Sequence, residues 1–333
     1  MNNTTTNNNL PLLVSGMRPT GRLHLGHLVG VLENWVKLQE SYRCYYLVAD
    51  WHVLTTAPDQ ARQIRTRTIE MVADWIAAGL NPEVAPIFRQ SKVVQHAELH
   101  LVFSMLITLN RLLRNPAVKE QAQSLGLEEI ISYGHVGYPV LQAADILVYK
   151  GAVVPVGEDQ LPHLEITREI AHRFNGLYGE VFPEPTALLT KFPRLPGLDG
   201  KRMSKSAGNT IQLSAEPEEI SSVMRTAFTD PLKLRRNDPG RPEVCLVYTY
   251  HQRFNPEEAG AIEADCRSGA LGCVDCKRRA SAKIATALEP IRTRHHEIMK
   301  DSNSVMDILL DGETRARKVA EETMNDVHKA IGL

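Results

Sequence analysis

The stretch SGMRPTGRLHLGHLVG, residues 15–30, continues a short apolar run, LLVSG, at 12–16. The apolar run ends in glycine and predicts a buried strand, and the pattern from about residue 25 to 38 predicts a helix. Pro19, Thr20 and Gly21 predict a turn between the two. A strand that leads through a turn into a helix is how a parallel sheet with crossover helices is built, and the helix N-terminus offers free N–H groups to a phosphate.

The rest of the chain extends this architecture. Apolar runs predict two more strands, CYYLVAD at 44–50 and APIFRQS at 85–91. Helical periodicity covers 59–80, 95–113, 138–149 and 157–174, and most of the chain from about residue 215. Residues 176–200 are rich in Pro and Gly and predict an elaborate connection without a helix.

These elements predict an α/β protein with a doubly wound, Rossmann-type parallel sheet. We place a disordered lead at residues 1–10 and the α/β domain at 11–210. A helical region then occupies 211–333, and its last helix could pack back on the α/β domain.

Composition narrows the class of protein. The chain has 333 residues, 43% of them hydrophobic, and a net charge of −1. No apolar run approaches the roughly 18 residues of a membrane span. The polar start of the chain does not resemble a signal peptide, so we expect a cytoplasmic protein with reduced thiols and no membrane contact.

A nucleic-acid partner would have to be met by local basic patches, because the net charge is close to zero. Three basic runs are candidates for contact with phosphates, and each could equally be an exposed helix face. They are KLRR at 233–236, KRRASAK at 277–283 and RTRHH at 292–296.

Two segments carry candidate phosphate chemistry. His24 and His27 lie three residues apart near a helix start, so they share one face, and Gly26 between them leaves room for a flat ring. The second segment, GKRMSKSAGNT at 200–210, is a small-residue loop in which Lys205 can bring positive charge over a triphosphate. Taken singly, each segment also fits a capped helix with surface histidines or a solvated basic loop.

Taken together, HLGH and MSKS about 180 residues later resemble the paired signatures of class I aminoacyl-tRNA synthetases, which bind ATP on a doubly wound sheet. The resemblance implies catalytic roles for His24, His27 and Lys205, with Mg²⁺ on the β- and γ-phosphates. It implies an ATP site of Thr20, His24, Gly26, His27, Lys119, Arg202, Met203, Ser204, Lys205 and Ser206. Arg202 stands where lysine is usual, which keeps the charge but changes the shape.

The length of the chain and one acidic residue narrow the choice of amino acid substrate. The chain has no visible editing insertion, so its amino acid must be separable by binding alone, as tyrosine and tryptophan are. Within GYPVLQAADILVYKGAVVPVGEDQ (137–160), Asp145 is a lone acid in an apolar segment. An indole N–H would satisfy that carboxylate, and a structural hydrogen bond is the alternative.

This run resembles bacterial tryptophanyl-tRNA synthetases, and the resemblance covers most of residues 12–333. It implies a tryptophan site of Val14, His52, Tyr138, Gln142, Asp145, Val154, Val156 and Gln160, with Asp145 accepting the indole N–H. Arg18 and Gln142 depart from the residues of many relatives. The implied reaction joins L-tryptophan to tRNA(Trp) by way of ATP, in a homodimer. The resemblance also implies that residues 11–210 are the catalytic domain and that the helical region at 211–333 binds the tRNA anticodon. A tyrosyl-tRNA synthetase and a non-catalytic tRNA-binding paralogue remain alternatives.

Four of the five cysteines form the pattern C-x20-C-x6-C-x2-C: Cys245, Cys266, Cys273 and Cys276. Clustered cysteines in a reducing compartment indicate a metal site more than a disulfide. Four thiolates can hold zinc or an iron–sulfur cluster, although structural zinc sites usually pair two CxxC knuckles and this chain has one. The pattern resembles a subset of bacterial tryptophanyl-tRNA synthetases in which these cysteines bind a 4Fe-4S cluster. Zinc and free thiols remain open.

Overall fold

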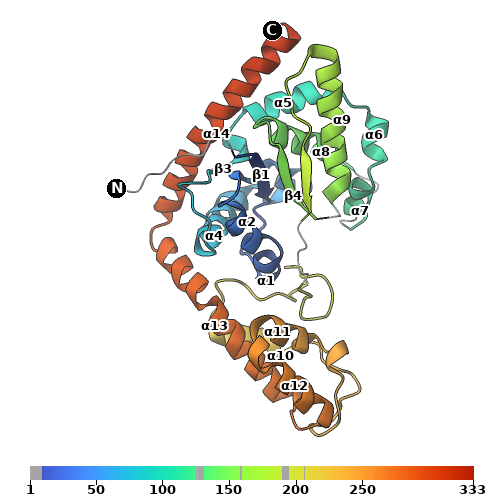
Figure 1. Ribbon diagram of the computed structural model, residues 1–333, viewed down its shortest axis with the longest axis vertical. Helices are drawn as coiled ribbons and strands as arrows, with labels where there is room; N and C mark the ends of the chain where they lie inside the picture. Colours follow the sequence, from blue (N-terminus) through green and yellow to red (C-terminus); the bar gives the residue numbers. More distant parts are fainter. Residues whose placement is uncertain (1–9, 125, 127–130, 158–159, 190–194, 206) are drawn as a thin grey trace.

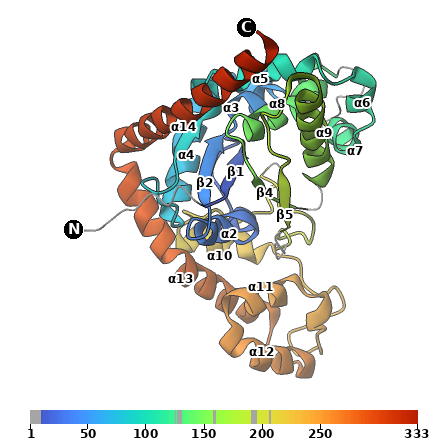
Figure 2. The same ribbon diagram turned by 45° about the horizontal axis from the view of Figure 1, so that its top comes forward.

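A computed structural model describes residues 10–124, 126, 131–157, 160–189, 195–205 and 207–333. Residues 1–9 of the predicted disordered lead lie outside the described residues. Five parallel strands form one sheet in the order β3-β2-β1-β4-β5 (Figures 1 and 2). The strands are β1 (Leu12–Met17), β2 (Arg43–Val48), β3 (Ile87–Arg89), β4 (Val153–Val156) and β5 (Thr186–Leu189). The predicted parallel α/β fold is confirmed.

Helices cover both faces of the sheet because successive strand residues point to opposite sides. Leu13 and Tyr46 pack into one core, together with Trp35 and Trp75, whereas Val14 and Tyr45 pack into the other. The first core is formed with α2 (Glu33–Leu38) and α4 (Ile64–Ala77). The second is formed with α5 (Gln95–Ser104), α8 (Tyr133–Leu147) and α9 (Leu161–Tyr178).

The strand order reverses between β1 and β4. The chain runs from β1 through β2 to β3 on one side, and later adds β4 and β5 on the other side of β1. In open parallel sheets, ligands bind in the crevice outside the carboxyl ends of the strands at such a switch point. The residues that follow β1 and those near β4 are therefore the place to seek a site.

Several predicted boundaries were wrong. The connection expected at 176–200 contains β5, and β4 was not predicted at all. The helix expected at 95–113 is two helices, α5 and α6 (Leu109–Leu113), because the Thr108 hydroxyl accepts from the Arg111 N–H and starts a new helix. A further helix, α7 (Pro116–Ser124), was also missed.

Two predicted helices begin differently from expected. The helix expected at 59–80 opens with a 3₁₀ turn, Pro58–Gln63, before α4. The helix expected from residue 25 consists of α1 (Leu25–His27), a π turn (Leu28–Leu32) and α2.

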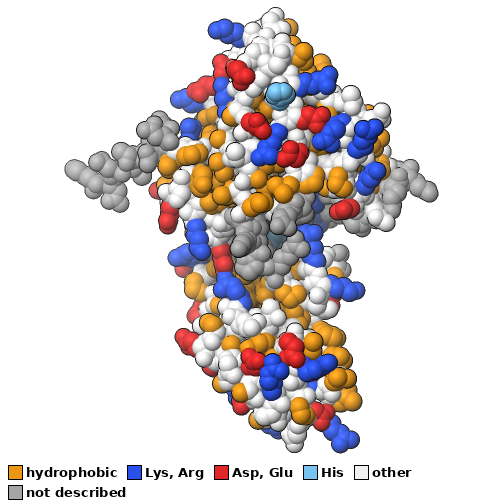
Figure 3. All heavy atoms as spheres, turned by 45° about the vertical axis from the view of Figure 1, so that its right-hand side comes forward, with side chains coloured by type: hydrophobic (Ala, Val, Ile, Leu, Met, Phe, Trp, Pro, Cys, Tyr) orange, Lys and Arg blue, Asp and Glu red, His pale blue; other side chains and the backbone are white. Residues whose placement is uncertain are grey.

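The C-terminal region is helical, as predicted. It contains α10 (Pro217–Arg225), α11 (Leu246–Phe254), α12 (Pro256–Ser268), α13 (Cys273–Met299) and α14 (Ser302–Ile331). Helix α13 packs on α10 and α4, and α14 returns along β3 and α5 (Figures 1 and 2). On the face shown in Figure 3, acidic and basic side chains are interspersed. Among the helices of the described chain, none is both long and apolar enough to cross a membrane.

Candidate active site

His24 and His27 hold each other in place at the start of α1. Nδ1 of His24 accepts from the Gly26 N–H at 3.2 Å, and the His24 N–H donates to Nδ1 of His27 at 3.3 Å. Their ring centroids are 3.9 Å apart. Because both Nδ1 atoms accept, the neutral rings carry their protons on Nε2, which leaves two N–H donors for a ligand.

Both imidazoles are neutral near pH 7. Burial lowers the pKa of His24 to about 4, and the charge of Lys205 contributes. Burial also lowers the pKa of His27 to about 3, assisted by His24, Lys205 and Arg202. The pair can therefore donate two hydrogen bonds to a phosphate while both rings are neutral.

The second predicted segment reaches the turn before α1. Nζ of Lys205 donates to the carbonyl of Gly21 at 2.7 Å and to the hydroxyl of Thr20 at 3.4 Å. Met203 lies so close to Gly26 that a Cβ on Gly26 would come within 2.9 Å of its sulfur. Burial lowers the pKa of Lys205 to about 8. The two segments thus meet at the switch point.

Asn209 holds the loop of the second segment in shape, and the sequence analysis did not predict this role. Its Nδ2 donates to the Asp199 carboxylate at 2.7 Å and to the Arg202 carbonyl at 3.1 Å, and its Oδ1 accepts from the Ser204 N–H at 2.8 Å. The side chain is buried, and a Cβ on Gly197 would lie 2.5 Å from it. Ser206 lies outside the described residues.

Asp145 on α8 is buried and accepts hydrogen bonds from three side chains. Oδ1 accepts from Gln90 at 2.6 Å and lies 2.6 Å from Nδ1 of His96, and Oδ2 lies 2.9 Å from Nε2 of His52. Burial alone would raise its pKa, but the hydrogen bonds and charges of His52 and His96 hold the pKa at about 2. Asp145 therefore makes the structural hydrogen bonds that the sequence left open as an alternative, and its contact with an indole stays a prediction. Among the described residues, Oδ2 has one donor and Oδ1 has two.

Gln90 and His96 were missed as partners of Asp145. Gln90 directly follows β3, and a polar residue at the carboxyl end of a parallel strand is a signal that could have found it. His96 also contacts the Tyr149 hydroxyl at 2.7 Å. No sequence pattern distinguishes it from an ordinary helical histidine.

The other residues predicted to bind tryptophan come from the sheet and from helices around it. Val14 is on β1, His52 on α3 (Asp50–Leu54), Tyr138 and Gln142 on α8, Val154 and Val156 on β4, and Gln160 just before α9. Val154 and Val156 are buried in an apolar cluster with Ile146. The Tyr138 hydroxyl lies 3.0 Å from Nε2 of His163. Lys119, a predicted ATP contact, is exposed on α7, and no hydrogen bond joins it to either signature within the described chain.

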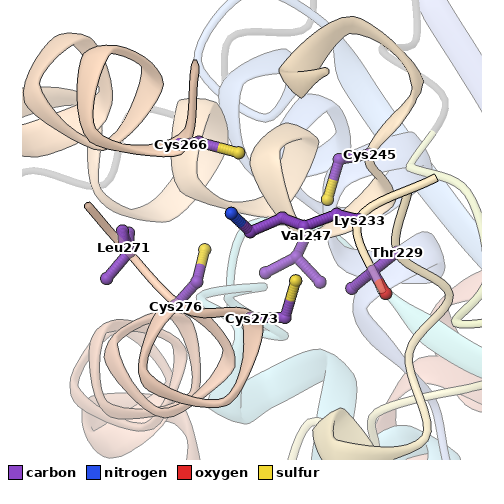
Figure 4. Close-up of a pocket in the computed structure, with 8 residues that line it drawn as sticks. All are labelled: Thr229, Lys233, Cys245, Val247, Cys266, Leu271, Cys273 and Cys276. Atoms are coloured by element: carbon purple, nitrogen blue, oxygen red, sulfur yellow. The ribbon is translucent and has the colours of Figure 1, made fainter. Parts of the chain in front are cut away.

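The four patterned cysteines line one cavity in the helical region (Figure 4). The other lining residues are Thr229, Lys233, Val247 and Leu271. Burial and the three neighbouring thiols raise the pKa of Cys276 to about 12. Burial, Cys245 and Cys273 also raise the pKa of Cys266, against the opposing charge of Lys233. Across the described part of the chain, no three His, Cys, Asp or Glu side chains are placed to hold a metal ion.

The basic runs are only partly available to a partner. Lys233 is buried and donates to the Asp238 carbonyl. Arg292 donates to the Ala215 carbonyl at 3.3 Å, and His295 is buried. The exposed basic residues of these runs include Arg235, Arg236, Arg278, Arg279 and Arg294.

A parallel sheet whose switch point carries the HLGH helix start, closed by a lysine-bearing loop, defines a class I aminoacyl-tRNA synthetase. The chain belongs to the family of class I tRNA synthetases for tryptophan and tyrosine, whose model matches residues 6–289. The predicted class of enzyme, an aminoacyl-tRNA ligase, is confirmed.

Individual relatives match nearly the whole chain. The tryptophan–tRNA ligase of Thermotoga maritima is 48% identical over 324 residues, covering 96% of this chain and 99% of that protein. The tryptophan–tRNA ligase of Aquifex aeolicus is 42% identical and covers the same shares. The structure of Campylobacter jejuni tryptophanyl-tRNA synthetase complexed with ADP and tryptophan is 28% identical, with a TM-score of 0.89 over 97% of this chain and 100% of that one.

Proposed function

We propose that this protein is a tryptophan–tRNA ligase that activates L-tryptophan with ATP and transfers it to tRNA(Trp). The meeting of the two signatures carries the proposal: Lys205 Nζ lies 2.7 Å from the Gly21 carbonyl, beside the His24 and His27 pair. Relatives with this activity in their names, 48% and 42% identical, support it.

In the first step, a tryptophan carboxylate oxygen forms a bond to the α-phosphorus of ATP. The bond from that phosphorus to the bridging oxygen breaks, and pyrophosphate leaves with the electron pair. Nε2–H of His24 and of His27 donates to phosphate oxygens, and Lys205 stabilises the charge on pyrophosphate. Thr20, Gly26, Arg202, Met203 and Ser204 shape the site. Mg²⁺ bound to the triphosphate would neutralise part of its charge.

The second step transfers the acyl group. The terminal ribose hydroxyl of the tRNA attacks the carbonyl carbon of the adenylate, AMP leaves, and the hydroxyl proton passes to the AMP phosphate. No protein nucleophile takes part, so catalysis consists of positioning and charge stabilisation.

For tryptophan recognition, we propose that Oδ2 of Asp145 accepts the indole N–H. His52, Gln90 and His96 already hold this carboxylate ionised and fix its orientation. Val14, Val154 and Val156 would pack on the ring, and Tyr138 and Gln160 would bind the ammonium group, with Gln142 at the edge of the pocket.

The test is amino-acid-dependent pyrophosphate exchange. We expect exchange with tryptophan and none with tyrosine. Lys205→Ala should slow it on the order of 100-fold, as removal of a transition-state donor does. Lys283→Ala, which breaks a surface ion pair with Glu258, is the matched control and should be unaffected. Exchange with tyrosine alone would make the chain a tyrosine enzyme, and no adenylate with either amino acid would make it a non-catalytic paralogue.

For tRNA, we propose that the exposed basic residues Arg235, Arg236, Arg278 and Arg279 meet phosphates. Their substitution by alanine should lower tRNA charging and make charging less sensitive to salt than in the wild type. Pyrophosphate exchange should be unchanged. Unaltered charging would mean that other residues contact the tRNA phosphates. The cytoplasmic location stays a prediction.

For the cysteines, we propose a 4Fe-4S cluster with a structural role. The donor set is entirely sulfur, and the four thiols crowd one cavity where burial disfavours uncompensated thiolates. Gly240 permits the surrounding loop to close, because a Cβ there would lie 2.6 Å from the Cys266 sulfur. Anaerobically purified protein should be brown, with about four iron atoms per chain. Colourless protein with one zinc ion per chain would show that the site holds zinc and not the cluster. Metal-free protein with full charging activity would rule out both metals.

For assembly, we propose a homodimer that buries an apolar stripe formed by α5, its two capping residues and the start of α6. Val94, Leu101, Met105 and Leu109 are 61%, 58%, 73% and 59% exposed. Large apolar side chains gathered on one surface mark a protein interface. The three positions 94, 101 and 105 are spaced seven and four residues apart, which places them on one helix face.

A further inference from the structure

Asp74 is a fully buried carboxylate beneath the first signature. It lies on α4, and its Oδ2 accepts from the backbone N–H of Leu23 at 2.9 Å. Leu23 directly precedes His24, and its carbonyl accepts from Leu213 at 2.9 Å. A hydrogen bond to an ionised carboxylate is roughly twice as strong as a neutral one. Asp74 therefore fixes the backbone that presents the histidine pair.

Asp74 also acts on the second signature. Burial lowers the pKa of Lys205, and the Asp74 charge opposes that effect. The same carboxylate thus steadies the backbone of one ATP signature and favours the charged form of the lysine in the other.

The second oxygen of Asp74 faces the C-terminal region. Oδ1 is 2.9 Å from Nδ1 of His295, a buried residue of α13. The contact is too bent for a hydrogen bond, and neither atom has a hydrogen-bond partner elsewhere in the described chain. Buried polar atoms without aligned partners cost stability. A small movement of α13 against α4 would therefore change how well this pair is satisfied.

Helix α13 also reaches the cysteine cavity. It begins at Cys273, and the 19 residues from Cys276 to His295 span about 28 Å at the helical rise of about 1.5 Å per residue. One continuous helix thus runs from the cavity to Asp74.

We propose that Asp74 is a positioning residue for ATP and that His295 makes this positioning depend on the seating of α13. A change at the far end of α13, such as tRNA contact, would then alter ATP use without touching ATP. The proposal rests on the proposed function only in taking ATP as the ligand of the two signatures.

The first experiment compares the binding of ATP with the binding of tryptophan in two variants of Asp74. Asp74→Leu removes both contacts, whereas Asp74→Asn keeps an oxygen that can accept from Leu23. We expect ATP affinity, measured by calorimetry, to fall about tenfold or more in Asp74→Leu and less in Asp74→Asn, as expected for a charged hydrogen bond. Tryptophan affinity should change less than about twofold, because a shift on that scale is below the effect of a lost hydrogen bond. Wild-type ATP affinity in both variants would overturn the proposal.

The second experiment is a double-mutant cycle with His295→Phe. The apolar pair Asp74→Leu/His295→Phe should recover stability relative to either single variant, yet ATP affinity should stay low because Leu23 still lacks its acceptor. His295→Phe alone should weaken ATP binding and speed hydrogen exchange at the Leu23 amide. No effect of His295→Phe on either measurement would remove the link to α13.

The control is Glu313→Gln, which weakens the buried ion pair with Arg89 between α14 and β3. It should lower stability with ATP affinity unchanged. An equal loss of ATP affinity in this control would mean that the Asp74 variants report general destabilisation. Calorimetric ATP binding needs no amino acid, so a failure of tryptophan specificity would leave this test readable.

Discussion

A buried carboxylate stays ionised only if its hydrogen-bond donors outweigh the cost of burial, and Asp145 meets that condition. His52, Gln90 and His96 supply the donors, and the pKa is held at about 2. Three donors already aligned on the carboxylate fix its direction before a ligand arrives. Such preorganisation means that little ordering is left for the binding step.

Asp145→Asn tests this site at the scale of one residue. The amide keeps the size but loses the charge, and a hydrogen bond to a charged group contributes about 1.5–3 kcal/mol. We expect KM for tryptophan to rise about tenfold to a hundredfold in pyrophosphate exchange, which is that free energy expressed as a ratio. Glu165→Gln, which removes an exposed partner of Arg168, should match the wild type. Unchanged kinetics in Asp145→Asn would make this acid purely structural.

Lys205 makes ATP use depend on pH. Its pKa is lowered to about 8, so the ammonium loses its proton as the pH rises above that value. The charge that helps bind phosphate is therefore present below about pH 8 and lost above it. We expect kcat/KM for ATP to fall above this pH, and the pH profile of exchange reports the free enzyme. Lys205→Arg keeps its charge throughout and should show no such fall. A flat wild-type profile would contradict the prediction.

At the scale of elements, periodicity predicted the strands and helices whose pattern is local. β1, β2 and β3 were found because each is a compact apolar run. β4 was missed because Pro155 lies within its four residues, and proline argues against a central strand; here only Leu13 and Val153 pair between β4 and β1. The signatures located His24, His27 and Lys205, but Asp74 and Asn209 act through contacts that only the folded chain creates.

The close packing of α14 against the sheet can be tested by adding one methyl group at Gly312. A Cβ at Gly312 would lie 2.0 Å from the Ile87 carbonyl oxygen, where backbone cannot easily move aside. We expect Gly312→Ala to lower the free energy of unfolding by about 1–3 kcal/mol or more, as overpacking does. Urea denaturation measures the change. Gly260→Ala, on α12 with open space around it, should instead be stabilising by about 0.5–1 kcal/mol. Equal effects in the two variants would mean that α14 is loosely docked.

At the scale of the whole molecule, two long helices tie the parts together. α13 links the cysteine cavity to α4, and α14 carries the chain back across β3 and α5 (Figure 1). The contact of α14 with α5 leaves the apolar stripe of Val94, Leu101, Met105 and Leu109 uncovered within one chain. The molecule therefore presents exposed apolar side chains on α5, at its two caps and on α6.

The proposed homodimer predicts that charge on this stripe separates the subunits. Leu101→Glu with Met105→Glu would place two carboxylates where apolar contact is expected, and burying an unpaired charge at an interface is strongly unfavourable. We expect light scattering to show two chains per particle for the wild type and one for the variant. Circular dichroism should be unchanged, because both side chains are exposed in the single chain. Leu234→Glu, at a position 86% exposed in the helical region, is the control and should remain dimeric. A wild-type monomer, or a variant that stays dimeric, would contradict an interface on this face.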